Sequence, residues 1–335
     1  MVIGESMYGS DRAGLVCGYA FRAGRPGQAI ESEAAANHLA ARRRQPGEFI
    51  WLHFSLTNAA SIRWLQEHVA LPDTFYSSVK ESTSTRVEAV DGALLAVIND
   101  VQFFATEVSS AATVTLCVTE DVVVSVRTTQ LRAIDRLRAS VKHGESFRST
   151  AELLAHLLRD QADVLVEIVR DATRQVDAVE DRIIAHRPAN RATLGSLRRV
   201  LVRLQRLLAP EPAALFRLLN RPPGWLHDAD VADLRQSAEE LSTAVSDSAA
   251  LVERIRLLQE ELVALINEQT NRTLFVLTVV TVLALPLTII PGIFGMNVRG
   301  IPFSEHDGGF WLVLLVVLAV VGLGTALAWM RYRKI

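Results

Sequence analysis

The sequence lacks the residue patterns of several common protein classes. Its two cysteines, Cys17 and Cys117, stand in unrelated apolar segments, which excludes a disulfide-rich scaffold and predicts two reduced, buried thiols in a reducing compartment. The formal net charge is −2, so no overall positive field indicates a nucleic acid partner. The eight histidines form neither a His-x-x-x-His pair nor a cluster with cysteine, so no zinc site of that kind is predicted.

The signatures of enzymes are missing as well. The chain has no Walker A motif, nucleophile elbow, zinc-protease helix or glycine-rich dinucleotide fingerprint. We therefore expect no enzymatic activity and no direct use of ATP. The first 30 residues lack the continuous apolar run of a signal peptide, so the polar part of the chain is expected to stay on the side of the membrane where it is made.

Charge is absent from two long segments near the C-terminus. No Asp, Glu, Lys or Arg occurs in residues 273–298 or 308–330, and each run exceeds the roughly 20 residues that a helix needs to cross a bilayer. Arg272 precedes the first run, and Arg331 and Lys334 follow the second. The positive-inside rule then predicts two spans with both chain termini in the cytoplasm.

Residues 1–148 have the pattern of a mixed α/β domain. Runs rich in Val, Ile, Leu and Phe, separated by turn signals such as Asp91-Gly92, predict strands. Helices are predicted after Asn58, a suitable N-cap, and after Leu71-Pro72-Asp73. The predicted strands are residues 15–21, 49–55, 94–104, 114–118 and 122–127.

From residue 149 onward the pattern is almost wholly helical. Ser149 or Thr150 is a suitable cap for a helix that runs to about residue 185, and a second helix is predicted over residues 192–208. The segment that starts at Asp228 has no Pro or Gly before Pro286. As one helix from Asp228 to Phe294 it would be about 100 Å long, which suits a cytoplasmic stalk that continues into a membrane.

The spacing of residues distinguishes two faces of this long helix. One face is a mostly apolar heptad seam, which predicts packing on a neighbouring helix; it consists of Val231, Leu234, Ala238, Leu241, Val245, Ser248, Val252, Ile255, Gln259, Leu262 and Ile266. The other face lies about 150° away around the helix. This ladder consists of Glu260, Ala264, Asn267, Asn271, Leu274, Thr278, Thr281, Leu285, Thr288, Gly292 and Gly295.

The three threonines between Leu274 and Phe294 all fall on the ladder, at Thr278, Thr281 and Thr288. One interpretation is that their hydroxyls only bond back to their own helix. The other is a weakly polar pore face, along which an ion would keep much of its water. Two spans in one chain cannot enclose a pore, so the second interpretation requires a symmetric homo-oligomer.

The first span ends in Gly295-Met296-Asn297, and Val298-Arg299-Gly300-Ile301-Pro302 follows. A Gly-Met-Asn that closes the first of two C-terminal spans resembles the CorA superfamily of divalent-cation transporters. The continuation Asn-Val-Arg-Gly-Ile-Pro is similar to the ZntB-type zinc transporters of that superfamily, as are Gly9-Ser10-Asp11, Trp51-Leu52-His53 and Glu81-Ser82-Thr83. The resemblance spans essentially the whole chain.

The resemblance implies a homopentamer in a bacterial inner membrane, with a funnel-shaped cytoplasmic domain, the first spans around a pore and the second spans outside. It implies a selectivity role for Gly295, Met296 and Asn297. Five Asn297 amide oxygens in a ring suit the water shell of a divalent cation, Gly295 permits close backbone approach, and Met296 is expected to pack. The pore-lining residues would be the seven ladder members from Asn267 to Thr288.

The loop between the spans offers further candidates. Arg299 stands where the ZntB branch usually has a small residue, and it places a positive charge near the pore entrance. His306 lies between Glu305 and Asp307, where it is a candidate to capture Zn²⁺ or to respond to external pH. Simple solvation also explains a loop histidine of this kind.

One helix also carries an acidic stripe, formed by Asp160, Asp163, Glu167 and Asp171. Such a stripe is usually a solvated helix face. The resemblance places the corresponding helices on the acid-rich outside of the funnel, so a secondary role in concentrating cations is the alternative.

The predicted organisation is an α/β domain (1–148), a helical stalk (149–272), a first span (273–298), an external loop (299–309), a second span (310–330) and a basic cytoplasmic tail (331–335). The leading hypothesis is Zn²⁺ transport through a pentameric pore, with Mg²⁺, Co²⁺, Ni²⁺ and Cd²⁺ as related cargo and no cofactor. Proton coupling stays open because neither span holds an ionisable side chain. The alternatives are a CorA-type Mg²⁺/Co²⁺ channel gated by intracellular metal and a two-span sensor without conduction.

Overall fold

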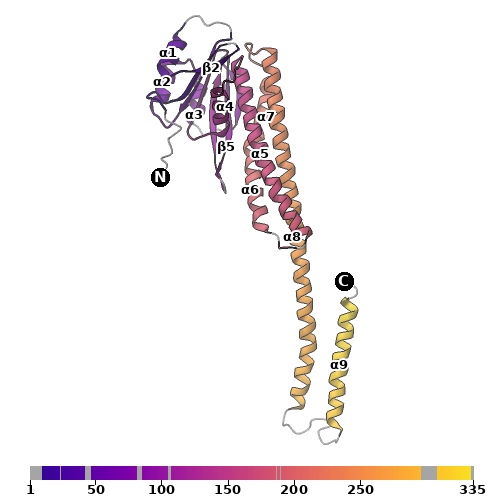
Figure 1. Cartoon of the computed structure of the whole chain (residues 1–335). Helices are drawn as coiled ribbons and strands as arrows, with labels where there is room; N and C mark the ends of the chain where they lie inside the picture. The colour runs from indigo at the N-terminus through magenta and orange to yellow at the C-terminus, as the bar shows by residue number, and fades with distance from the viewer. Residues whose placement is uncertain are drawn as a thin grey trace. The chain divides into compact units, whose positions relative to one another are not determined.

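The computed structural model describes residues 10–22, 24–41, 47–80, 85–104, 107–185, 187–188, 190–295 and 308–332. Contacts within the chain divide it into two compact units, Met1–Leu258 and Gln259–Ile335. The first unit contains a sheet and long helices, and the second contains the apolar end of one long helix and one further helix (Figure 1).

A seven-stranded sheet forms the centre of the first unit. Its strand order is β2-β1-β3-β7-β6-β5-β4, and β3 and β7 run parallel while the other neighbours are antiparallel. Both β3 and β7 are buried along their length, which explains their almost continuous apolar sequence. The strands are β1 (Leu15–Arg22), β2 (Arg25–Ala29), β3 (Phe49–Ser55), β4 (Arg86–Val90), β5 (Ala93–Phe104), β6 (Glu107–Val118) and β7 (Val122–Arg127).

Helices cover both faces of this sheet, because alternate residues of each strand point to opposite faces. Leu52 packs in a core with α1 (Ser32–Ala40), α2 (Ala60–His68) and α3 (Asp73–Lys80). Its neighbour Trp51 packs in a second core with α4 (Arg132–Lys142), α5 (Thr150–Ile184) and α7 (Pro210–Leu219). Figure 1 shows α1 and α2 on one side of the strands and α5 and α7 on the other.

The sequence predicted the strands with strong apolar patterns and missed weaker elements. The predictions for β1, β3, β5 and β7 agree with the structure to within one residue at each end, whereas β6 begins seven residues earlier than predicted. Strands β2 and β4 were missed because they have no fully buried residue. Helix α1 buries only Ala35. Helix α4 was missed although Ile134, Leu137 and Val141 repeat at helical spacing.

The Asp91-Gly92 turn joins β4 to β5, as its sequence predicted. Asp91 and Gly92 have φ values of 50° and 79°, the left-handed conformation that a tight antiparallel hairpin requires. The Trp225 indole N–H donates to the Gly92 carbonyl oxygen at 2.7 Å, so the turn is tied to the segment that leads into the last long helix of this unit.

The helical part also follows the predicted pattern. Ser149 Oγ accepts a hydrogen bond from the Glu152 backbone N–H at 3.0 Å, which caps α5. Helix α6 (Arg191–Leu208) follows, and α8 (Asp228–Phe294) is one helix of 67 residues.

The apolar seam of α8 is buried within the first unit. Ser237 Oγ donates to the Ala155 carbonyl oxygen of α5 at 3.0 Å. Farther along, Arg254 forms an ion pair with Asp177 at 2.8 Å and another with Glu180, both on α5. The seam residues of this unit with less than a tenth of their surface exposed are Leu234, Ala238, Leu241, Ser248 and Ile255.

The last member of the predicted seam is not covered within the single chain. Ile266 is 49% exposed. It belongs to the second unit, and the next residue of α8 with partial cover is Phe275, nine residues later. The heptad spacing continues past the point where the chain supplies anything to pack on, so spacing alone could not locate the end of the seam.

A buried carboxylate ties three elements of the first unit together. Glu211 of α7 is 1% exposed. Its Oε1 accepts from the Asn99 backbone N–H of β5 at 2.7 Å, and its Oε2 accepts from Gln161 Nε2 of α5 at 2.7 Å. Burial of a charged group costs free energy unless hydrogen bonds compensate it, and here the donors come from the sheet and from a neighbouring helix.

We predict that Glu211→Ala destabilises the protein by about 2 kcal/mol or more, because it leaves two buried donors without their acceptor. Thermal unfolding of the full-length protein in detergent measures this effect. Glu239→Ala is the matched control, since Glu239 is an exposed acid on α8 and its removal should shift the midpoint little. Equal midpoints for the two variants would contradict the role of Glu211.

Candidate functional site

The second unit holds the helices that fit a membrane. The apolar end of α8 and helix α9 (Gly309–Tyr332) are long and apolar enough to cross a bilayer. Their most apolar windows are 0% and 6% buried in the chain. Such exposure excludes the core helices of a soluble protein, and the position late in the chain excludes a signal sequence.

Helix α9 packs on one face of α8 within this unit, and Figure 1 shows the two helices side by side. A side chain placed at Gly324 would meet Leu283 Cδ2 at 3.3 Å, so the glycine permits the close approach typical of membrane helices. Val317 of α9 is 7% exposed. The residues of α8 that are partly covered in this stretch are Phe275, Val279, Leu283, Pro286 and Ile290.

The predicted ladder occupies a different face of the same helix. At 100° per residue its centre lies about 140° from the covered face, and the ladder residues are exposed in the single chain: Asn267, Asn271, Leu274, Thr278, Thr281, Leu285 and Thr288. Leu274 and Leu285 are 54% and 56% exposed. The second span therefore covers α8 on a face away from the threonines and leaves their own face open.

The ladder threonines bond back to their own helix. Thr278 and Thr281 donate to the carbonyl oxygens four residues earlier at 2.8 and 2.9 Å, and Thr288 donates to Leu285 O at 3.0 Å. Such bonds agree with the interpretation that the hydroxyls serve their own helix. They do not exclude the interpretation as a pore face, because a hydroxyl that donates its hydrogen to the backbone still has lone pairs that can face a cation or its water.

The predicted entrance lies mostly outside the described residues. Gly295 is described and is exposed just after the end of α8. Outside the described residues lie Met296, Asn297, Arg299, Glu305, His306 and Asp307.

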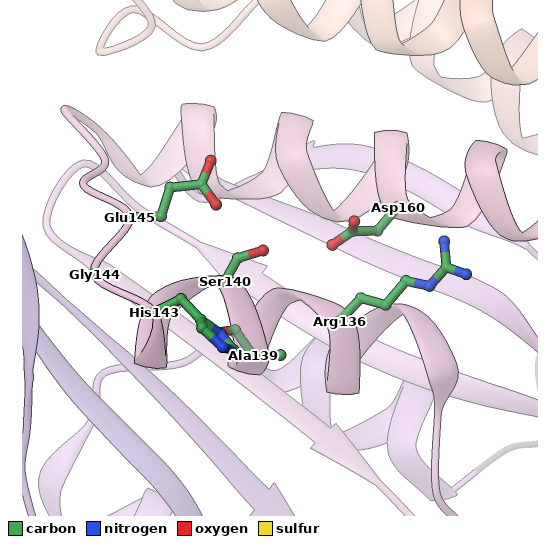
Figure 2. Close-up of a pocket in the computed structure, with 7 residues that line it drawn as sticks. All are labelled: Arg136, Ala139, Ser140, His143, Gly144, Glu145 and Asp160. Carbon is green, nitrogen blue, oxygen red and sulfur yellow. The ribbon is translucent and has the colours of Figure 1, made fainter.

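The first unit has a shallow depression between α4 and α5, with a volume of about 680 Å³. Figure 2 shows Arg136 on α4, His143 directly after its end, Glu145 on the connection to α5, and Asp160 on α5 itself. Gly144 has a φ of 95°, the left-handed conformation with which many helices end. The turn sends Glu145 toward α5. The sequence did not single out Glu145, whose relation to α5 depends on this turn.

The acidic stripe of α5 is not a uniform solvated face. Arg136 binds Glu167 at 2.7 Å and Arg174 binds Asp171 at 2.8 Å, so part of the stripe is neutralised by neighbouring arginines. Asp160 points into the depression and its side chain is 14% exposed. The simple solvated interpretation is therefore wrong for Asp160. Among the described residues, no group of three or more His, Cys, Asp and Glu side chains is arranged to hold a metal ion.

Comparison with known proteins assigns the family. The sequence profile of the family described as "CorA-like Mg2+ transporter protein" matches residues 46–331 of this chain, which is most of its length. The chain belongs to the CorA-like transporter family. The resemblance to the CorA superfamily and to its ZntB-type members, drawn above from the motifs, is confirmed.

Relatives of this CorA-like chain include two named transporters. It is 26% identical over 286 residues to the zinc transport protein ZntB of Pectobacterium atrosepticum, with 85% of this chain and 86% of the relative covered. It is 28% identical over 334 residues to the divalent cation transporter CmaX of Pseudomonas aeruginosa, with 97% of each chain covered. A solved structure of full-length CmaX superposes with a TM-score of 0.80 at 26% identity, covering 98% of this chain and 99% of that one. The predicted CorA-like fold is confirmed.

Two ZntB-like motifs of this CorA-like chain have structural roles. In Trp51-Leu52-His53, the Trp51 indole N–H donates to Ser125 Oγ at 2.9 Å, and His53 Nδ1 lies 2.8 Å from the same oxygen. Burial and two nearby arginines hold the pKa of His53 well below its usual value, so this histidine is a neutral core residue. Asp11 Oδ1 accepts from the Leu15 N–H at 2.9 Å and fixes the start of β1.

The two thiols are free, as predicted. Cys117 is buried and Cys17 is partly buried. Burial raises the pKa of each thiol to about 12, so both remain protonated at neutral pH and are poor nucleophiles and poor metal ligands.

We predict that Thr278→Val lowers metal flux through the reconstituted CorA-like protein several-fold, because valine keeps the shape of the side chain and removes its oxygen. Thr325→Val is the matched control: Thr325 makes the same backbone hydrogen bond on α9, to Val321 O at 3.0 Å, but lies on the second span. Uptake of metal into proteoliposomes measures both. If the two variants lose flux equally, the ladder has no special role.

Proposed function

We propose that this protein transports divalent metal cations, with Zn²⁺ as the principal ion, through a pore that the α8 helices of five identical chains form around one axis. No enzymatic activity is assigned to it. The proposal places the protein in a bacterial inner membrane, with both termini and the first unit in the cytoplasm.

One observation carries the proposal. The weakly polar ladder of α8 lies on a face that α9 leaves open, and it runs from Asn267 to Thr288 in a segment flanked by apolar helix surface. A face with hydroxyl and amide oxygens gains little from contact with lipid tails. Its natural environment is water or another copy of the same helix, and five copies around an axis provide both.

The chemistry of the ladder suits a hydrated ion. The pore face of the span carries no charge between residues 273 and 298, so it offers no carboxylate to strip water from a divalent cation. Threonine oxygens that already donate to their own helix present acceptors to the hydrogens of the water shell. At the outer end, a ring of Asn297 amides would be the selective element, with Arg299 and His306 as neighbours in the loop.

The preference for Zn²⁺ is supported by the similarity to ZntB proteins over 85% of the chain and by the Asn-Val-Arg-Gly-Ile-Pro loop sequence. A Mg²⁺/Co²⁺ channel gated by intracellular metal is the second candidate, and the description of the matching family by Mg²⁺ favours it. The relative with the greater coverage is named only for divalent cations, which fits both. Cd²⁺ and Ni²⁺ are compatible as further transported ions with both candidates.

Uptake into proteoliposomes separates these candidates. We would load vesicles with a metal-sensitive dye and add Zn²⁺, Mg²⁺, Co²⁺ or Ni²⁺, with and without an imposed pH gradient. Zn²⁺ flux above Mg²⁺ flux supports the proposal. Mg²⁺ flux that follows voltage, without a flux of Zn²⁺, would assign the protein to the second candidate. Absence of any flux would favour a sensor without conduction.

We predict that Asn297→Ala abolishes selective uptake and leaves the oligomer intact, because alanine removes the amide oxygens that would face the ion. Size-exclusion chromatography of the detergent-solubilised variant tests assembly, and the dye assay tests uptake. Met296→Leu is the control, since Met296 is expected only to pack and leucine preserves its volume. Unchanged uptake in Asn297→Ala would refute the assigned role.

A further inference from the structure

His156 of α5 lies between two carboxylates that come from different parts of the chain. Its Nδ1 is 3.5 Å from Glu145 Oε1, on the connection that follows α4, and its Nε2 is 3.7 Å from Asp160 Oδ2, one turn farther along α5. Charge-assisted hydrogen bonds of this kind are usually about 2.7–2.9 Å long. Both contacts are therefore looser than a protonated imidazole would make them.

The cluster is sheltered from solvent on one side and open on the other. The side chains of His156 and Asp160 are 18% and 14% exposed, and the Phe147 ring and the imidazole are in edge-to-face contact with 5.3 Å between ring centres. Among the described residues, buried Asp160 Oδ2 has no hydrogen-bond donor. The depression of Figure 2, with Asp160 and Glu145 in its wall, gives water and protons access to the group.

The charged groups around His156 and Asp160 come from α4, from the connection that follows it, and from α5. Arg136 faces Asp160 from α4, and its guanidinium is already bound to Glu167. Glu145 faces both groups from the connection. The charged neighbours on α5 itself are Glu152, Arg159 and Asp163. Around His156 and Asp160, these three acids outnumber the two arginines, which favours an added proton.

Burial is the main cause of the shifted titration of both groups. It raises the pKa of Asp160 to about 7, with Asp163 and Glu145 adding to the rise and Arg136 opposing it. It lowers the pKa of His156, with Glu145 opposing the decrease. Because the two groups are close, they bind one proton as a pair rather than separately, and Asp160 is the member of the pair whose pKa is raised toward neutral pH.

We propose that His156, Asp160 and Glu145 form a proton-binding site that tightens the connection between α4 and α5 when it is protonated. Without the proton, His156 is neutral between two carboxylates, and the contacts are the loose ones seen here. With the proton bound between Asp160 Oδ2 and His156 Nε2, these two atoms form a hydrogen bond, and the N–H at Nδ1 of the imidazole donates to Glu145. The negative charge of the three groups falls from two to one, and the connection is drawn toward α5.

The connection has backbone hydrogen bonds that report such a change. His143 N–H donates to Ala139 O at 2.9 Å, and Glu145 N–H donates to Ser140 O at 3.2 Å. Arg148 N–H donates to the Glu152 carboxylate at 2.6 Å. Tightening of Glu145 onto α5 restricts the openings through which these amides exchange with solvent.

Hydrogen–deuterium exchange of the full-length protein in lipid nanodiscs tests the proposal at pH 6 and pH 8, after correction for the intrinsic pH dependence of exchange. We expect peptides that cover residues 143–149 to be several-fold more protected at pH 6. The same peptides should show equal corrected protection at both pH values in Asp160→Asn, which removes the titrating carboxylate at almost constant shape, and in His156→Gln, which removes the bridge.

Asp171→Asn is the matched control, because Asp171 is an exposed acid of the same helix that pairs only with its own neighbours in the described residues, Arg174 and Gln175. It should retain the pH difference of the wild-type protein, and peptides from the middle of α5 provide an internal check of folding in every variant. Equal corrected protection of the wild-type protein at both pH values, or a pH difference that survives in Asp160→Asn, would overturn the proposal. The measurement involves no transport, so its outcome is independent of the ion that the protein carries.

Discussion

The second unit depends on one constraint: a chain with two membrane helices can cover only part of the surface of each. Helix α9 packs on the face of α8 that contains Leu283, where Gly324 permits close contact. Between membrane helices there is no hydrophobic driving force, so close packing and small residues decide which faces meet. The threonine ladder takes no part in the contact between α8 and α9. Its hydroxyls donate their hydrogens to backbone carbonyl oxygens of α8 itself. In the proposed oligomer, this ladder surface faces the other copies of α8 and lines the pore.

The soluble unit shows how differently two buried carboxyl groups behave. Glu211 is 1% exposed, but it accepts hydrogen bonds from a strand and from a neighbouring helix, so its oxygens are satisfied by fixed donors. Asp160 lies at the edge of an open depression, and its Oδ2 has no donor among the described residues. A buried carboxylate without donors favours its neutral form. The first group fastens the fold, and the second is free to take up a proton near neutral pH.

The strands show where sequence patterns suffice. Strands β3 and β7 are buried on both sides and read as apolar runs, and their predicted ends are those of the structure. The exposed strand β2 carries Arg-Pro-Gly-Gln-Ala and gives no periodic signal; only its pairing with β1 makes it a strand. The same reason explains the seam of α8. Its spacing predicted packing as far as Ile266, but whether Ile266 is covered depends on which element lies beside it.

By itself the sequence determined the two apolar spans, the 67-residue helix that enters the first of them, and the alignment of three threonines on one face, because hydropathy and helical period are local properties of the chain. It also carried the Gly-Met-Asn motif that indicates the family. Only the tertiary structure decided which face of α8 meets α9, and that Glu145, His156 and Asp160 come together. A glycine turn brings Glu145 back to a helix face eleven residues later in the chain, and no periodicity encodes a contact that depends on where a loop returns.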